Sequence, residues 1–539
     1  MDTKALRQKI LDLAIRGKLV PQDPSDEPAS VLLEKIREEK ARMVKDGKLK
    51  KKDIKNDSII YVGEDNLHYE KFQDGTVKCI ENEIPFELPE GWAWSRLHPL
   101  TIKIGAGSTP AGGAAVYSNS GIKFIRSQNV YDNGLVLNDV AYISEEINQK
   151  KSGSIVKPQD ILLNITGGSI GRCALVPDDF DIANVNQHVL IIRLVEVSLR
   201  QYIHSVIISP YIQEQILSKQ VGSGRGGLSA ETTSSFLIPI PPIQEQYAIQ
   251  DKLQQCISCV SEIAIEKTNI INLVSKAKDK ILDLAIRGQL VPQDPNDEPA
   301  SVLLDHIRAE KDELVKQGKI KRDKKESIIF KGEDNSYYEK LGEDVRCIDE
   351  EIPYDIPDSW EWVRLKNCCI KEIRRGKSPK YTAKSNTLVF AQKCNTKYNG
   401  IDIGLALYLD ESTLGRYPNE EYIHDSDVVV NSTGTGTLGR IGFYRTTDNI
   451  PGLPIVPDSH VTVIRGFRSI RAFYLYIFMK ANQSVLEKKG EGSTNQKELK
   501  PITLKEMLVP MPPASEQQRI ENAIITAFSF VEMIEKSLN

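Results

Sequence analysis

The stretch PIQEQYAIQDKLQQCISCVSEIAIEKTNIINLVSKAKDKILDLAIRG, residues 242–288, decides the fold of this chain. Its apolar residues recur at alternating steps of four and three, which is the heptad pattern of a helix packed along another helix. Pro242 is a start signal and Gly288 a stop signal, so the pattern predicts one helix, roughly 65–70 Å long at ~1.5 Å per residue. A helix of this length is interpreted as a spacer. Its expected seam consists of Ile249, Leu253, Val260, Ile263, Ile270, Val274, Ile281 and Leu284.

A second copy of this helix is divided between the two ends of the chain. Residues 512–539 match the start of the stretch, and residues 10–37 match residues 281–308, which include its end, both at an offset of 271 (512 minus 241). We therefore predict a tandem duplication with pseudo-two-fold symmetry, in which the chain ends lie close together and rebuild a second helix antiparallel to the first. The alternative is a duplication without such symmetry. The expected seam of the second helix consists of Ile520, Ile524, Val531, Ile534, Ile10 and Leu13.

Composition indicates several ordinary globular domains. The chain has 539 residues, of which 40% are hydrophobic, and a mean hydropathy of −0.32. No apolar run approaches the ~20 residues that a membrane span needs, and the N-terminus lacks an apolar signal core, so we expect a cytoplasmic protein without membrane association. The net charge of −4 decides little, because a local basic face can bind DNA.

The eight cysteines do not form a metal site. Cys256 and Cys259 are spaced as CxxC, but no second pair follows at the spacing that a four-ligand zinc site requires. Adjacent Cys368 and Cys369 are equally isolated. We interpret these residues as structural thiols and expect no metal.

Matched framework segments precede each globular part of the chain. A charged helix is expected over residues 29–45, followed by a basic run at 45–55 whose counterpart is 316–325. The run is either a solvated helix end and loop or a loop that contacts phosphates or a partner. Extended stretches at 58–90 and 327–358 lead into Trp-x-Trp motifs, for which we expect a strand with both rings on one face. Anchoring in a core is the expected role of these rings, and stacking on bases is the alternative.

The globular segments at 91–240 and 359–511 are where the two copies diverge. Short β-branched runs broken by Gly, Ser, Thr and Asn predict strands, and helices are expected near 199–219 and 469–487. Each segment is interpreted as an α/β domain with a twisted, mostly antiparallel sheet. A few landmarks survive in both copies, namely Asn164 and Asn431, Arg172 and Arg440, and His188 and His460.

Catalytic motifs are missing from the sequence. Gly376-Lys377-Ser378 resembles the end of a phosphate-binding loop, but position 371 is Lys where that loop requires Gly. HExxH does not occur, and no Asn/Asp-Pro-Pro-aromatic tetrapeptide of the amino-methyltransferases is present. A binding and assembly protein is therefore favoured over an enzyme.

The organisation resembles the specificity subunit of type I restriction-modification systems over essentially the whole chain. The resemblance is carried by two Pro-Pro-x-x-Glu-Gln motifs that end at Gln246 and Gln517, each opening a long helix, and by ILDLAIRG at 281–288 with its twin at 10–17. The plan of two variable domains and two helices completes it. One departure is that much of this family begins directly with the first recognition domain, whereas residues 1–90 come first here.

The resemblance implies a non-catalytic subunit without cofactors of its own. Each variable segment would be a target recognition domain that reads one half of a split, asymmetric site in double-stranded DNA, largely through the major groove. The helices would fix the unread gap and dock two methyltransferase subunits that carry S-adenosylmethionine and flip the target adenines. Restriction subunits with translocase activity would join the complex, and ATP and Mg²⁺ would be bound by these subunits.

The fold class that follows is α+β, with two α/β recognition domains joined by a pair of long antiparallel coiled-coil helices. The expected boundaries are an N-terminal helical repeat (1–57), the first recognition domain (58–240), the central long helix and helical repeat (241–326), the second recognition domain (327–511) and the C-terminal long helix (512–539).

Polar side chains in Gly-flanked loops are the candidates for base reading. Arg pairs with guanine, and Asn or Gln with adenine, through two hydrogen bonds each. Phosphate positioning or a structural role remains the alternative for each residue. The candidates are Arg126, Gln128, Asn129, Arg172 and Arg225 in the first domain and Lys393, Asn395, Thr435, Arg440 and Gln496 in the second.

Two other functions remain open on the sequence alone. The first is a coiled-coil scaffold with two protein-binding modules and no DNA specificity, against which steeply salt-dependent, sequence-dependent DNA binding would discriminate. The second is an enzyme with an unrecognised site, such as a nuclease, which metal-dependent DNA cleavage by the purified chain would favour.

Overall fold

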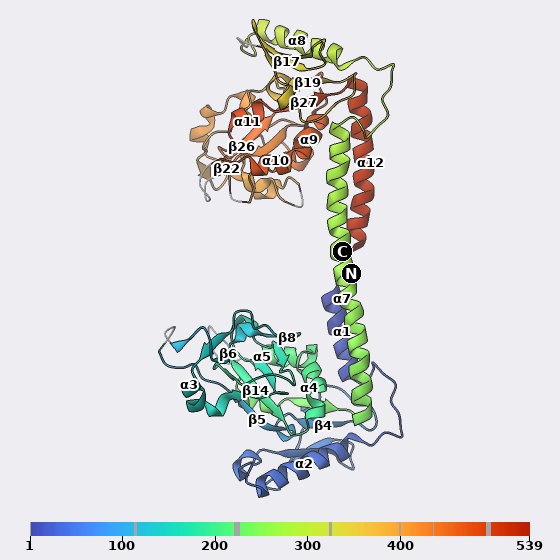
Figure 1. Ribbon diagram of the computed structural model, residues 1–539, viewed down its shortest axis with the longest axis vertical. Helices are drawn as coiled ribbons and strands as arrows, with labels where there is room; N and C mark the ends of the chain where they lie inside the picture. Colours follow the sequence, from blue (N-terminus) through green and yellow to red (C-terminus); the bar gives the residue numbers. More distant parts are fainter. Residues whose placement is uncertain are drawn as a thin grey trace. The chain divides into compact units, whose positions relative to one another are not determined.

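The computed structural model describes residues 2–112, 116–219, 227–322, 326–397, 400–434, 436–491 and 497–538. The chain divides into two compact units, Met1–Lys267 and Thr268–Asn539 (Figure 1). Each unit contains helices and several small sheets in a matching order. The internal duplication and the mixed helix and sheet composition are therefore confirmed.

The long helix forms where the heptad pattern predicts it. Helix α7 (Ile243–Ile286) begins directly after Pro242 and has 44 residues. It ends before Gly288, whose φ of +68° places it in the left-handed region that favours glycine. The first part of α7 belongs to the first unit, where α1 (Thr3–Ile15) packs against it, and the second part belongs to the second unit together with α12 (Ala514–Leu538).

The residues of the predicted seam differ in burial along the rods. Ile249, Leu253, Val260 and Val274 are buried in α7, and Ile520 and Ile524 in α12. Ile263, Ile270 and Ile534 are instead 39%, 36% and 45% exposed. Val531, Ile281, Leu284, Ile10 and Leu13 are only half-buried.

The error in the seam has a geometric cause. A strict repeat of 3.5 residues drifts by about 20° per heptad against a helix of 3.6 residues per turn. Over four to five heptads the buried stripe moves by one position. Leu282 and Ala285 are accordingly buried in place of Ile281 and Leu284, and Leu11 and Ala14 in place of Ile10 and Leu13.

A helix and a three-stranded antiparallel sheet follow the rod segments in each unit. The first unit has α2 (Ala29–Lys45) and the sheet β1 (Ser58–Val62), β2 (His68–Phe72) and β3 (Val77–Cys79). The second unit has α8 (Ala300–Lys316) and the sheet β16 (Ser327–Lys331), β17 (Tyr337–Leu341) and β18 (Asp344–Cys347). The order of strands is the same in both sheets.

The recognition segment of the first unit contains two four-stranded sheets. One has the order β12 (Cys173–Leu175), β11 (Ile161–Asn164), β14 (Val189–Leu194), β5 (Thr101–Ala106) and is antiparallel throughout. The other has the order β10 (Ile155–Val156), β13 (Ala183–Val185), β6 (Ile122–Ile125), β9 (Ala141–Ile143), and its β13–β6 pair is parallel. A hairpin of β7 (Val130–Tyr131) and β8 (Gly134–Leu135) and the short helix α3 (Glu145–Lys150) complete the segment.

The second unit repeats this plan with fewer strands. One sheet has the order β24 (Ile441–Phe443), β23 (Val428–Asn431), β26 (Val461–Ile464). The other has the order β20 (Tyr381–Thr382), β22 (Leu407–Leu409), β21 (Leu388–Phe390), β25 (Ile455–Pro457), again with one parallel pair, β21–β25. The prediction of mostly antiparallel pairing is confirmed, but each domain has two sheets rather than one.

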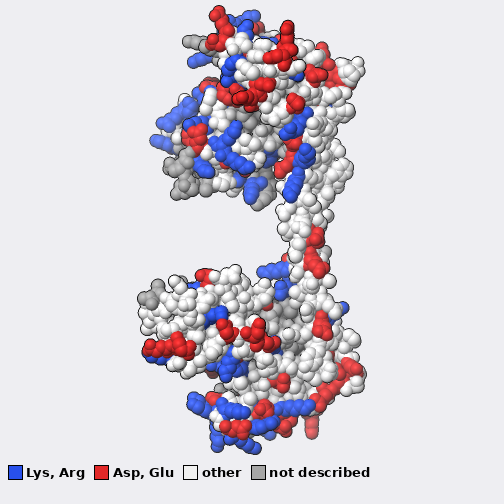
Figure 2. Space-filling view, in the orientation of Figure 1, with Lys and Arg blue, Asp and Glu red and all other residues white. Residues whose placement is uncertain are grey.

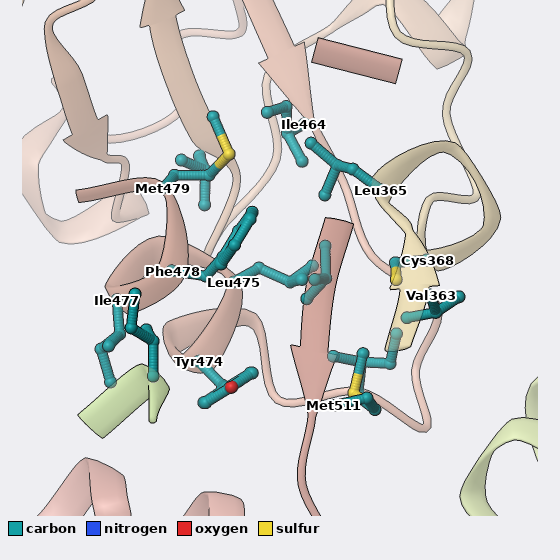
Figure 3. Packing of buried hydrophobic residues seen from close by; sticks show 14 of the residues in the cluster. Val363, Leu365, Cys368, Ile464, Tyr474, Leu475, Ile477, Phe478, Met479 and Met511 are labelled. Carbon is teal, nitrogen blue, oxygen red and sulfur yellow. The ribbon is translucent and has the colours of Figure 1, made fainter. Parts of the chain in front are cut away.

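The helices near the end of each recognition segment are broken. The expected helix at 199–219 consists of α4 (Arg200–Ile207) and α5 (Pro210–Ser218), because Pro210 has no N–H to donate and starts a new helix. The expected helix at 469–487 consists of α9 (Ala472–Ala481) and α10 (Gln483–Lys488). Tyr474, Leu475 and Phe478 of α9 lie in the main core of the second unit (Figure 3).

The two tryptophans of each motif enter different cores. Strands β4 (Ala93–Arg96) and β19 (Glu361–Arg364) begin after the first tryptophan, so the expectation of two rings on one face is wrong. Trp92 packs with the rod helices, whereas Trp94 packs under the three-stranded sheet, and Trp360 and Trp362 repeat this division. All four are at most 9% exposed, which confirms core anchoring.

The Pro-Pro-x-x-Glu-Gln motifs connect the tryptophans to the rods. After β15 (Leu237–Ile240), Glu245 accepts hydrogen bonds from Trp92 Nε1 at 2.8 Å and from Gln22 Nε2 at 3.0 Å. After β27 (Leu508–Met511), Glu516 accepts the same bonds from Trp360 at 2.9 Å and Gln293 at 2.6 Å. Burial raises the pKa of both carboxyl groups. The glutamate of each motif therefore fixes the start of a rod to the first tryptophan of a Trp-x-Trp motif.

The ion pairs under the second three-stranded sheet predict loss of stability in acid. Burial of Glu339 opposes its ionisation, but hydrogen bonds from Arg364, Ser327 and Arg346 outweigh burial and lower the pKa of Glu339 to about 2. The stabilisation is present above the unfolded-state pKa of about 4.3 and is lost as the pH falls through the folded-state pKa. We expect the denaturant concentration at the unfolding midpoint of the second unit to decrease as the pH is lowered from about 4 to about 2. In a Glu339→Gln variant this decrease should be smaller. Equal decreases in the native chain and the variant would contradict the assignment.

Candidate nucleic-acid interface

Two loops that carry candidate residues are held together in the first recognition domain. One follows β6 and contains Arg126, Gln128 and Asn129, and the other joins β11 to β12 and contains Arg172. Asn164, which is fully buried at the end of β11, donates from Nδ2 to the carbonyl oxygen of Ser127 at 2.8 Å. The bond ties the two loops, so the sequence-predicted residues are brought to one place.

The second domain holds its loops in the same way. Asn431 at the end of β23 donates to the carbonyl oxygen of Gln392 at 3.0 Å. In addition, Arg440 donates to the carbonyl oxygen of Asn395 at 2.7 Å, and Asn395 donates to that of Arg440 at 3.0 Å. Gly439 has a φ of +76°, and a Cβ there would lie 2.7 Å from the backbone nitrogen of Glu487, so the turn requires glycine.

A histidine and a threonine pair at the matched position of both domains. Thr166 Oγ1 lies 2.5 Å from His188 Nδ1, and Thr433 Oγ1 lies 2.5 Å from His460 Nδ1. The backbone of His460 donates to Asp458, whose pKa is raised by burial, whereas in the first domain Asn186 accepts the equivalent bond. These histidines are satisfied residues that fix the strand ends.

The candidates of the first domain differ in how freely they can contact a ligand. Gln128 is exposed, and its amide donates to Asp139 at 2.9 Å. Arg126 is half-buried and donates to the carbonyl oxygen of Asp139 at 3.2 Å, whereas the half-buried Arg172 lies 4.6 Å from the ring of Tyr131. Asn129 is buried, accepts from the backbone of Arg126 and donates to the carbonyl oxygen of Val136, which follows β8, so it positions the loop. Arg225 lies outside the described residues.

The candidates of the second domain divide in the same way. Lys393 is exposed, whereas Asn395 is 1% exposed and is engaged by Arg440. Arg440 is half-buried and uses both terminal nitrogens on backbone oxygens, those of Asn395 and Gly436. Thr435 and Gln496 lie outside the described residues.

Sequence reasoning overlooked one exposed residue beside these loops. Gln187 precedes His188, is exposed, and accepts a hydrogen bond from the backbone of Thr109 at 3.1 Å. Its position next to His188, which matches His460 of the second domain, was the available signal in the sequence. The matched position in the second domain is Ser459, so Gln187 is a point at which the two domains differ.

Neither surface charge nor metal ligands mark a second site among the residues that the structure describes. Lys and Arg side chains and carboxylates are interspersed over the visible face of each unit (Figure 2). Within the described ranges, no group of three His, Cys, Asp or Glu residues is placed to hold a metal ion. Among the same residues, no helix is both long and apolar enough to cross a membrane.

Comparison with known proteins decides what these paired domains are. The family model described as the type I restriction modification DNA specificity domain matches twice, at residues 89–275 and 357–539. The chain belongs to the type I restriction-modification DNA specificity family. Each match covers one recognition segment and the long helical segment that follows it. A mixed fold with two repeated specificity domains is thereby established.

Specificity subunits of two Escherichia coli enzymes are similar to the chain. The EcoAI subunit is 30% identical over 67% of this chain and 62% of its own length. The EcoEI subunit is 26% identical over 99% of this chain and 90% of its own length. A solved chain from a study of assembly and conformational transition of the type I system has the same fold, with a TM-score of 0.53 and 16% identity over 84% of this chain and 94% of its own. The relatives are specificity subunits, which implies a non-catalytic role.

Proposed function

We propose that the chain reads a bipartite, asymmetric site in double-stranded DNA, with one recognition domain on each half. One observation carries the proposal: the DNA specificity model matches both domains, while their frameworks agree and their loops differ. Equal frameworks with unequal loops are suited to two readers of two different sequences. A scaffold without DNA specificity has no support, because the matching family is defined by DNA specificity.

The long helices are proposed to act as an antiparallel coiled-coil pair that sets the unread gap. Support comes from the order of contacts in the second unit. Lys278 binds Glu535 at 2.8 Å, whereas Gln293, further along the chain, binds Glu516, which lies earlier in α12. Residue numbers therefore increase along α7 and the segment after it while they decrease along α12, as they do in an antiparallel pair. The helix formed by the two chain ends would be the partner of α7.

We also propose that these helices dock two methyltransferase subunits. Exposed apolar side chains support docking, since Ile265 and Leu273 of α7 are 60% and 63% exposed, and Phe530 and Met533 of α12 are 59% and 56% exposed. The methyltransferase subunits would carry S-adenosylmethionine, and restriction subunits would bring ATP and Mg²⁺. The chain itself would hold no cofactor.

Substitution of a loop cation tests the assignment of half-sites. An Arg126→Ala variant is expected to lose about 1–3 kcal/mol of discrimination at one base pair of the half-site that the first domain reads. Binding to a library randomised in both half-sites measures this loss. A Lys393→Ala variant in the second domain should affect only the other half-site. A uniform weakening over all sequences would assign Arg126 to phosphate contact instead.

A further inference from the structure

The first unit holds a cavity of about 220 Å³ between helix α2 and the strands β1 and β4. Ile36, Trp94 and Leu100 line the cavity and are buried. Ile59 and Tyr61 of β1 also line it and are exposed. The cavity therefore has a closed, apolar floor and opens to solvent beside β1. Because an apolar cavity of roughly 150 Å³ accepts a molecule of the size of benzene, an aromatic ring with a short side chain fits this one.

The side chains that β4 contributes to the cavity are small. Ala93 and Ser95 both line it, and residues at alternate positions of a strand lie on the same face. At the matched positions of β19 the second unit has Glu361 and Val363, although the two Trp-x-Trp motifs align and α2 and α8 are similar in sequence. The two copies therefore share the framework of this place but differ in the volume of the side chains that fill it.

The second unit fills the matched place with its own side chains. Val363 is 7% exposed and belongs to the same buried cluster as Leu303 and Ile307 of α8. Glu361 is half-buried. Burial raises the pKa of Glu361 and the charge of Arg308 opposes this rise, so the carboxylate and the guanidinium interact. The second unit thus shows which chemistry suits this place, namely apolar carbon together with a carboxylate close to the arginine.

The first unit keeps the arginine but has Ala93 in place of the carboxylate. Arg37 matches Arg308, lines the cavity and is half-buried. Its guanidinium pairs with the exposed Glu34, and that of Arg308 pairs with Asp305 in the same way. A guanidinium has five N–H donors, so a pair of this kind at the surface leaves donors for a second carboxylate. Arg37 is therefore placed to receive a carboxylate that the chain itself does not supply.

The buried carboxylate in the lining of the cavity is already paired. Asp57 is 8% exposed, and Lys40 donates to its Oδ1 at 2.8 Å. His98 Nδ1 lies 2.7 Å from the same oxygen. A cationic ligand would meet carboxylates that already have partners and would be repelled by Arg37. The charges of the cavity therefore favour an acid over a base.

We propose that this cavity binds a small monocarboxylic acid with an apolar body, whose carboxylate lies on Arg37 and whose body lies on the apolar floor. The ligand would take the place that Glu361 and Val363 take in the second unit. The proposal does not depend on the proposed function, because the lining residues come from α2, the three-stranded sheet, β4 and the segments beside them. A suitable probe is 3-phenylpropionate, which consists of an aromatic ring and a short arm that ends in a carboxylate.

Transfer of side chains from the second copy to the first tests the proposal. Binding of 3-phenylpropionate to the full chain is measured by titration calorimetry, and hydrogen exchange locates the site. We expect one site per native chain, with slower exchange in α2, β1 and β4 and no change in α8, β16 and β19. Ala93→Glu combined with Ser95→Val fills the cavity with the side chains of the second unit, so it should weaken binding at least tenfold.

Replacement of the arginine tests the role of the carboxylate separately. Arg37→Gln should weaken binding of the acid at least tenfold but leave binding of the uncharged 3-phenylpropionamide unchanged, because only the acid loses a charged hydrogen bond. Arg308→Gln is the matched control and should change neither. Since Arg37 lies at the surface of α2, this variant folds and keeps the test valid if the filled variant is unstable.

Three results would overturn the proposal. The first is a native chain that does not bind the acid, or that binds it with slower exchange only outside α2, β1 and β4. The second is equal binding of the acid to the native chain and to a folded chain with the filled cavity. The third is an equal effect of Arg37→Gln on the acid and on the amide.

Discussion

Insertion of one heptad into α7 at Lys267, with a second heptad in α12, is expected to lengthen the unread spacer of the recognised site by about three base pairs. Seven residues add about 10 Å to a helix, and base pairs are about 3.4 Å apart. A whole heptad returns the following residues to nearly the same face of the helix, so the packing of each unit is retained. The recognised motif is read from adenine methylation in cells that express the variant.

The control for this insertion replaces seven residues of α7 without adding length. It should leave the spacer unchanged, and both half-sites should keep their sequences in either variant. An unchanged spacer in the lengthened protein would remove the role of the helices as a ruler.

Replacement of Arg364 by Ala is expected to destabilise the second unit by about 3–5 kcal/mol, since it leaves a buried charge without its partner. Arg364 is 2% exposed and donates to both oxygens of Glu339, at 3.0 and 2.9 Å, and to Glu351 at 2.7 Å. It also donates to the carbonyl oxygen of Glu506 at 2.8 Å, which connects the sheet to the start of β27. Hydrogen exchange in β16, β17 and β19 against denaturant measures the loss.

A neighbouring arginine supplies the matched control. Arg346 also binds Glu339, but its side chain is 51% exposed, so Arg346→Ala should cost only about 0–1 kcal/mol. Equal losses for the two variants would show that burial does not determine the strength of this network. Exchange in the first unit should be unaffected by either change.

Much of the framework could be predicted because it depends on local signals. The heptads, Pro242 and Gly288 place α7 within two residues of its observed bounds. The repeat at an offset of 271 residues predicts matching elements in the two units. The role of Glu245 was not predictable, because Trp92 and Gln22 reach it from far along the chain.

The candidate interface was predictable in place but not in detail. Sequence selected loops that do converge, since Asn164 and Asn431 hold them together. Sequence could not distinguish exposed Gln128 and Lys393 from buried Asn129 and Asn395, because burial depends on strands that are distant in the chain. Several seam residues were predicted wrongly for a similar reason. The rotation of the buried stripe around the helix accumulates over several heptads and is not visible in any one of them.

Base-resolved adenine methylation of the host genome, with and without the gene for this chain, tests the central claim most directly. The account predicts that a motif of two specified halves around a fixed unread gap loses methylation when the gene is deleted and regains it on complementation. Complementation with Arg126→Ala should relax one half only. In a host whose methyltransferase subunits are active, an unchanged methylation pattern would contradict the account.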